Sequence, residues 1–163
     1  MRVPLLAWAP GFIQPKSVLE QVVMNVDIAP TFLELAGMDV PKNMQGQSFL
    51  PLLQGKSIPW RNKVFYEYYW EFDFPMTPTV FGVRSDKFKY IRYYGIWDTN
   101  ELYDLEKDPD ETTNLISKPE YAETAKKLAG ELFDWLEQTG GMQIPFKRTI
   151  KNPYGDYRHP NQF

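Results

Sequence analysis

Residues 79–110, TVFGVRSDKFKYIRYYGIWDTNELYDLEKDPD, contain three short segments with the alternating pattern of β-strands. In the first, Phe81 and Val83 share one face, and a Ser-Asp pair then supplies turn chemistry. The second, residues 88–94, is rich in aromatic and β-branched side chains, and the third covers residues 101–105. Because the connections are short, the pattern predicts an antiparallel meander with one face on a core.

Two flanking segments complete this predicted unit. The aromatic stretch 64–70 is expected to join the sheet as a fourth strand. A long helix is expected from Ser117, which has capping-box spacing to Glu120. Its apolar stripe consists of Tyr121, Ala125, Leu128, Leu132, Trp135 and Leu136. The sequence therefore predicts an α+β unit, a sheet of about four antiparallel strands covered by a long C-terminal helix.

The N-terminal segment predicts a different environment. Residues 3–9, VPLLAWA, are apolar without alternation, which is typical of a strand buried on both faces. No second run of this type follows before residue 64, so the strand lacks the neighbours it needs. We therefore expect residues 1–62 to be the end of a larger α/β domain and residues 63–163 to form a C-terminal subdomain. An exposed edge strand of a complete small domain is the alternative, and either arrangement favours self-association through this segment.

A helix is also expected after Asp27, with Ile28, Phe32 and Leu35 on one face and Gly37 as its stop. A single carboxylate in this position is more typical of a helix cap than of a metal ligand. We therefore predict that Asp27 caps the helix.

Composition excludes several classes of function. The chain has 163 residues, a net charge of -3 and no cysteine, so disulfides and thiolate metal sites are excluded. The basic residues Lys87, Lys89 and Arg92 are interpreted as the solvated face of a strand rather than as a nucleic-acid footprint. No apolar run approaches the ~20 residues needed to cross a bilayer. We expect neither a nucleic-acid nor a membrane partner.

Four motifs in fixed order resemble one enzyme family. They are MRVPLLAWAPG, VDIAPTFLELAGMDVP, MQGQSFLPLLQG, and FGVRSDKFKYIRYY followed by NELYDLEKDPDETTNL. Together they are similar to the C-terminal portion of the formylglycine-dependent sulfatases, which have an alkaline-phosphatase-like α/β fold. PTVFGVRSDKFKYIRY and WDTNELYD resemble sulfatases that act on 6-sulfated N-acetylglucosamine in glycans. The resemblance implies a sulfated glycan or aryl sulfate substrate, and a periplasmic, secreted or lysosomal location.

The catalytic chemistry of that family lies outside the matched region. The chain has no cysteine, and no serine lies in the C/S-x-P/A-x-R motif from which formylglycine is made. The family's metal-binding residues also lie upstream, so calcium and formylglycine are implied only for the parent enzyme. We expect no catalytic residue and no metal ligand in this chain, and no sulfatase activity from it alone.

A substrate-side role remains, since the small subdomain of the resembled family borders the active-site pocket. An aromatic ring can stack on a sugar, and polar side chains can bind its hydroxyls. The candidate substrate-binding residues are Trp97, Asp98, Asn100, Arg158 and His159. The competing interpretation is that Trp97 closes the end of the sheet, that Asp98 and Asn100 are turn residues, and that His159 is a surface residue. Two other functions stay open, a stand-alone carbohydrate- or protein-binding module and a related phosphoesterase.

Overall fold

The computed structural model describes residues 3–71, 76–94 and 99–142. The chain divides into two compact units, Met1–Val64 and Phe65–Phe163, and each is described by itself.

The first unit contains a 3-10 turn, η1 (Asn25–Asp27), and two helices, α1 (Ile28–Leu35) and α2 (Leu50–Leu53). The buried hydroxyl of Thr31 joins the two helical regions. It donates to the carbonyl of Asp27 (2.7 Å) and accepts the amide N–H of Phe49 (3.1 Å). Gly37 follows α1 with φ +70°, a left-handed conformation that glycine adopts without steric cost.

The strand expected over residues 3–9 is not formed. This segment has no regular secondary structure, and Leu6 and Trp8 are 94% and 88% exposed. A strand is stabilised by hydrogen bonds to a neighbouring strand, and no described segment pairs with these residues. The apolar character of residues 3–9 therefore has no matching surface within the described chain.

The predicted apolar face of α1 is also uncovered. Ile28, Phe32 and Leu35 are exposed, whereas the buried positions of the helix are Pro30 and Thr31. The helix is therefore present, but the side of it that faces the described protein is not the apolar stripe.

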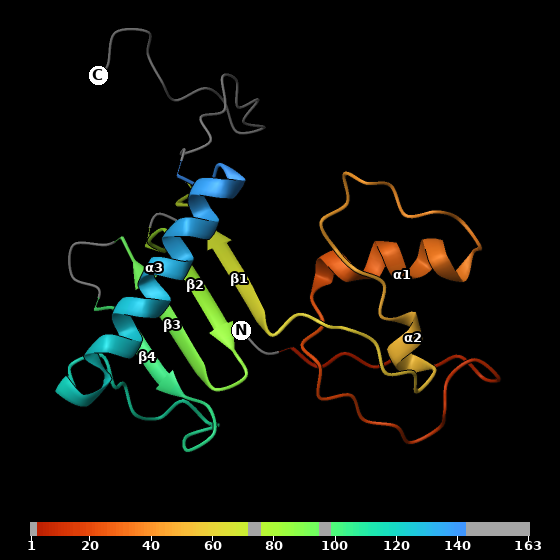
Figure 1. The fold of residues 1–163 in the computed structure, drawn as a ribbon, viewed down its shortest axis with the longest axis horizontal. Helices are drawn as coiled ribbons and strands as arrows, with labels where there is room; N and C mark the ends of the chain where they lie inside the picture. The colour runs from red at the N-terminus through yellow and green to blue at the C-terminus, as the bar shows by residue number, and fades with distance from the viewer. Residues whose placement is uncertain (1–2, 72–75, 95–98, 143–163) are drawn as a thin grey trace, which may run out of the picture. The chain divides into compact units, whose positions relative to one another are not determined.

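The second unit is built on a sheet with the order β1-β2-β3-β4. Its strands are β1 (Lys63–Tyr68), β2 (Val80–Ser85), β3 (Phe88–Tyr93) and β4 (Glu101–Asp104). The register pairs Val83 with Tyr90 and Tyr90 with Leu102, both antiparallel, and Figure 1 shows β1 and β2 running in opposite directions. The predicted four-stranded antiparallel meander is confirmed.

Helix α3 (Ala122–Thr139) covers one face of this sheet (Figure 1). The buried cluster between them consists of Phe81, Val83, Tyr90, Leu102, Leu128, Leu132 and Leu136. At its edge, the rings of Phe65 and Trp135 stack with their centroids 4.7 Å apart. The predicted stripe of α3 is the stripe that packs, so its 3.6-residue period located this core correctly.

The predicted start of the helix is wrong in detail. A 3-10 turn, η2 (Pro119–Tyr121), precedes α3, and neither element has a side-chain cap at its N-terminus. Ser117 therefore does not form the expected capping box. The proline at the first position of η2 begins the helical segment there, because its fixed φ suits a helix start and it has no N–H to satisfy.

Candidate functional site

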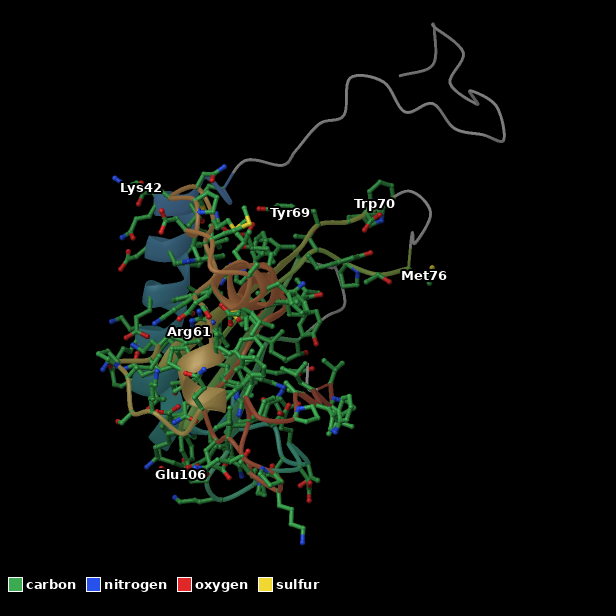
Figure 2. All side chains as sticks on the ribbon, turned by 90° about the vertical axis from the view of Figure 1, so that its right-hand side faces the viewer. Lys42, Arg61, Tyr69, Trp70, Met76 and Glu106 are labelled. Carbon is green, nitrogen blue, oxygen red and sulfur yellow. The ribbon has the colours of Figure 1, made fainter. Side chains whose placement is uncertain are left out.

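One end of the sheet gathers the features that suit ligand binding. At this end, called the loop end, β1 and β3 finish, and β2 and β4 begin. The opposite end carries the tight turn between β2 and β3. Figure 2 shows Trp70 and Met76 at the loop end, and Glu106 far away toward the opposite end.

Thr79 holds two aromatic residues of the loop end in place. Its hydroxyl accepts the amide N–H of Trp70 at 2.9 Å, and its carbonyl accepts the amide N–H of Tyr94 at 2.9 Å. Trp70 and Tyr94 are 51% and 47% exposed. Trp70 follows β1 and Tyr94 follows β3, and the backbone of each is hydrogen-bonded to Thr79. Much of the surface of both residues faces solvent, so their amphipathic rings are available for contact with a ligand.

Asn100 closes the same end of the sheet between β3 and β4. Its Oδ1 accepts the amide N–H of Tyr93 at 3.2 Å, and its carbonyl accepts a hydrogen bond from Asn114 Nδ2 at 3.1 Å. Asn114 is held in turn, because its Oδ1 accepts the amide N–H groups of Leu102 and Ile116, both at 3.0 Å. Asn100 is therefore fixed by its carbonyl oxygens, and its side chain also carries two N–H donors on Nδ2.

The other predicted substrate-binding residues are Trp97, Asp98, Arg158 and His159, and they lie outside the described residues. Their role toward substrate stays a prediction, and for Trp97, Asp98 and His159 we also expect a common concavity in the parent enzyme. Asn100 is described at the loop end, and its role toward substrate also stays a prediction.

Arg92 is a feature of the loop end that the sequence interpretation missed. Its guanidinium carbon lies 5.2 Å from the ring centroid of Tyr94 and 5.0 Å from that of Phe133 in α3. Arg92 is thus on the helix-covered face, not on a solvated one. The available signal was its position, because Arg92 is an even number of residues from Phe88 and Tyr90 and must share their face.

The second basic residue of β3, Lys89, is also not solvated. It is 4% exposed on the other face of the sheet, forms an ion pair with Glu111, and lies 5.6 Å from the ring centroid of Tyr103.

Glu101 lies on the same face and accepts hydrogen bonds from the hydroxyl groups of Tyr93 (3.1 Å) and Tyr103 (3.0 Å). Burial, reinforced by the Glu101 carboxylate, raises the pKa of Tyr103 to about 12. The polar side chains of this face are therefore bonded to one another. Of the three basic residues interpreted as solvated, Lys87, Lys89 and Arg92, only Lys87 is largely exposed.

Asp27 does not cap α1, contrary to the prediction. No side-chain cap is formed there. Instead its fully buried carboxylate accepts the amide N–H groups of Met24 (2.7 Å) and Gln47 (2.8 Å) and both Nη groups of Arg61. Burial alone would raise the pKa of Asp27, but these hydrogen bonds outweigh it and hold the pKa below its ordinary value. The carboxylate of Asp27 therefore holds together three separate segments of the first unit, which carry Met24, Gln47 and Arg61.

The described residues do not fit the cofactors that the family resemblance implies. No group of three or more His, Cys, Asp or Glu side chains that could hold a metal ion occurs within residues 3–71, 76–94 and 99–142. The whole sequence contains no cysteine as a formylglycine precursor. No chemical step can therefore be assigned to calcium or formylglycine on these residues.

Among the described residues, no helix is both long enough and apolar enough to cross a bilayer.

The mixed α/β fold places the chain among the alkaline-phosphatase-like sulfatases. A protein solved in complex with its substrate, D-glucosamine-2-N,6-O-disulfate, matches 81% of the chain with a TM-score of 0.70 and 36% identity. Phosphonate monoester hydrolase of Agrobacterium radiobacter matches 74% of the chain with a TM-score of 0.60 and 26% identity. The matches cover 27% and 26% of those two solved chains.

Sequence comparison identifies the family within this class. The family described as N-sulphoglucosamine sulphohydrolase, C-terminal, matches residues 1–138, and the chain belongs to it. An N-acetylglucosamine-6-O-sulfatase of Bacteroides thetaiotaomicron is 40% identical over 144 residues, covering 85% of this chain and 25% of the relative. Arylsulfatase K of Gallus gallus is 34% identical over 170 residues, covering 94% of this chain and 31% of the relative. The sulfatase resemblance is confirmed, and the chain spans about a quarter to a third of the length of these relatives.

Proposed function

We propose that this chain is the C-terminal part of an enzyme that hydrolyses sulfate esters of glycans, of the N-acetylglucosamine 6-sulfate type. The observation that carries the proposal is the 40% identity to an N-acetylglucosamine-6-O-sulfatase over 144 residues. The glucosamine disulfate bound by the first structural relative above supports the same class of substrate. By the family resemblance, we place the parent enzyme in the periplasm, the lysosome or outside the cell.

Within that enzyme, we assign this chain a structural and substrate-side role. Sulfate ester hydrolysis requires a nucleophile, a cation and groups that stabilise the developing charge, all preorganised in one site. The sequence has no formylglycine precursor, and the described residues have no carboxylate cluster for a metal. The loop end offers what a sugar requires instead, namely exposed aromatic rings on Trp70 and Tyr94 and the amide of Asn100.

A second candidate function is a stand-alone carbohydrate-binding module. The exposed rings of Trp70 and Tyr94, fixed by Thr79, are the observation that favours it. The two functions differ in one respect, because only the first requires further sequence that carries a C/S-x-P/A-x-R motif.

The test compares this chain with a longer product of the same gene that includes upstream coding sequence. Both are incubated with N-acetylglucosamine 6-sulfate and calcium, and sulfate release is followed. We expect turnover from the longer protein and none above a matched blank from the 163-residue chain. Turnover by the chain alone that survives repurification would contradict the assigned role, and an upstream sequence without the motif would favour the binding module.

Substrate-side residues are tested in the longer protein. Alanine at Trp97, Asp98 or Asn100 is expected to raise KM for the sulfated sugar more than it lowers kcat, because these side chains would bind the sugar rather than the reacting sulfate. An unchanged KM in all three variants would contradict their assignment.

A further inference from the structure

Arg92 combines a partly buried charge with no acidic partner in the described protein. Its guanidinium carbon lies 5.2 Å from the ring centroid of Tyr94 and 5.0 Å from that of Phe133. Its Nε is buried and has no hydrogen-bond partner. Arginine stays protonated at any physiological pH, so this is a fixed positive charge with unused donor capacity.

Four other cations of the described segments each lie beside a carboxylate. Ion pairs join Arg61 to Asp27, Lys87 to Glu106, Lys89 to Glu111 and Lys107 to Asp104. No carboxylate of the described residues lies within ion-pair distance of Arg92. A charge that is withdrawn from water without a counter-ion is costly, and an incoming anion relieves that cost.

The surroundings of Arg92 give the anion a chemical class. The residue lies near the end of β3, two positions before Tyr94 on the loop end, where Trp70 is also exposed. The guanidinium lies within about 5 Å of two ring centroids, and its planar fork favours bidentate binding of a planar carboxylate or of two sulfate oxygens. Exposed aromatic rings beside such a cation suit a ligand that has both an apolar sugar face and an anionic substituent.

We infer that Arg92 and Tyr94 form a subsite for an anionic sugar residue of the glycan chain, separate from the sulfate that is hydrolysed. Arg92 binds a sulfate or uronate carboxylate, and the sugar ring packs against Tyr94. The inference rests on the proposed function, because it assumes a sulfated glycan as ligand. It adds a preference for substrates that carry a second negative charge.

The test is a binding measurement that needs no turnover. The 163-residue chain is titrated, by isothermal calorimetry, with a tetrasaccharide of alternating uronate and glucosamine 6-sulfate units. Arg92→Gln is expected to weaken binding by about tenfold or more, since a hydrogen-bonded charge is lost. Arg92→Lys keeps the charge but not the planar fork, and an intermediate loss is expected.

Arg84→Gln is the matched control. Arg84 also has a buried Nε without a hydrogen-bond partner, but it points to the other face of the sheet near the turn end. This variant is expected to bind like the wild type. Equal weakening by Arg84→Gln and Arg92→Gln, or unchanged binding by Arg92→Gln, would overturn the inference.

Two modified probes identify the anion. A desulfated tetrasaccharide and a carboxyl-reduced one are compared, and the group whose removal abolishes the difference between wild type and Arg92→Gln is the one that Arg92 binds. If neither removal affects that difference, the inference is wrong.

Should Arg92→Gln fail to fold, Arg92→Lys and Tyr94→Ala carry the same test. A longer protein that lacks sulfatase activity but shows Arg92-dependent binding would overturn the proposed function and leave the subsite in place.

Discussion

Asp27 and Arg61, separated by 34 residues in the sequence, are joined by two parallel hydrogen bonds, of 2.5 Å between Nη1 and Oδ2 and 2.6 Å between Nη2 and Oδ1. The carboxylate is fully buried, and the arginine side chain is 20% exposed. The guanidinium also lies 4.7 Å from the ring centroid of Trp60, whose Nε1 donates to the carbonyl of Val22. The pair therefore connects η1 to the segment that leads into β1.

Asp27→Asn is expected to destabilise the first unit by about 3–5 kcal/mol, because it leaves Arg61 without its counter-ion. The folded-state pKa of Asp27 lies below the ordinary value of 3.8, so its contribution is present above pH 3.8 and is lost as the pH falls through the lower folded-state pKa. The difference between variant and wild type should therefore shrink in acid. Urea unfolding at several pH values measures it, with the exposed Asp39→Asn as control. A difference that does not change with pH would exclude the charge as its cause.

Two ion pairs of the second unit provide a comparison of burial. Lys89 and Glu111 have side-chain exposures of 5% and 24%, whereas Lys87 and Glu106 have 49% and 60%. Glu111→Gln is expected to cost about 3 kcal/mol, because the buried ammonium of Lys89 loses its partner. Glu106→Gln removes the same charge from an exposed pair, where solvent screens the interaction, and should cost much less. Thermal unfolding of both variants gives the comparison, and equal losses would contradict it.

The sequence predicted those parts of the fold that bury a periodic apolar face. The strands at 80–85 and 88–93 and helix α3 bury such faces against one another, so period-two and period-3.6 patterns were sufficient although α3 is distant in the chain. The interpretation failed where a single polar side chain binds distant groups. The carboxylate of Asp27 binds groups 20 and 34 residues away, and no local pattern encodes those contacts.

The candidate site was predictable only in part. The alternating pattern placed Asn100 in a connection between two predicted strands, which the structure puts at the loop end. The role of Thr79 was not predictable, because its hydroxyl and its carbonyl accept the amide N–H groups of Trp70 and Tyr94, and a residue pattern does not show such contacts. The position of Arg92 was available from residue parity along β3, but its stacking on Phe133 depends on where α3 crosses the sheet.

Glu101→Gln is expected to lower the pKa of Tyr103 from about 12 toward its ordinary value of 10.0, because the variant removes a negative charge beside the phenol. The folded-state pKa is raised, so the neutral phenol stabilises the fold below pH 10.0 and this contribution is lost as the pH rises through about 12. Ultraviolet absorbance of phenolate, followed against pH, measures the change. Tyr69, which donates to Glu67 and has a pKa of about 12, should titrate as before and serves as an internal control.

The exposed apolar side chains of residues 3–9 are expected to drive self-association of the chain. Leu6 and Trp8 are 94% and 88% exposed, and burial of such surface is favourable at about 25 cal/mol per Å². The double variant Leu6→Lys and Trp8→Lys should therefore sediment as a smaller species than the wild type at the same concentration. Lys16→Leu, an apolar substitution outside this segment, should leave the association of the wild type in place. Identical sedimentation of the double variant and the wild type would exclude this segment as the interface.

Two glycines are expected to respond in opposite directions to the same substitution. A Cβ at Gly46 would lie 1.9 Å from the carbonyl oxygen of Val26, a backbone atom that cannot move aside without displacing η1. Gly46→Ala is therefore expected to destabilise the first unit by about 1–3 kcal/mol or more. Gly130 lies inside α3 with nothing within 4 Å of the added Cβ, so Gly130→Ala should stabilise the helix by about 0.5–1 kcal/mol through its better helix propensity. Both values follow from urea unfolding monitored by circular dichroism. A loss of stability in Gly130→Ala, or none in Gly46→Ala, would show that the packing around these two backbones differs from the one described.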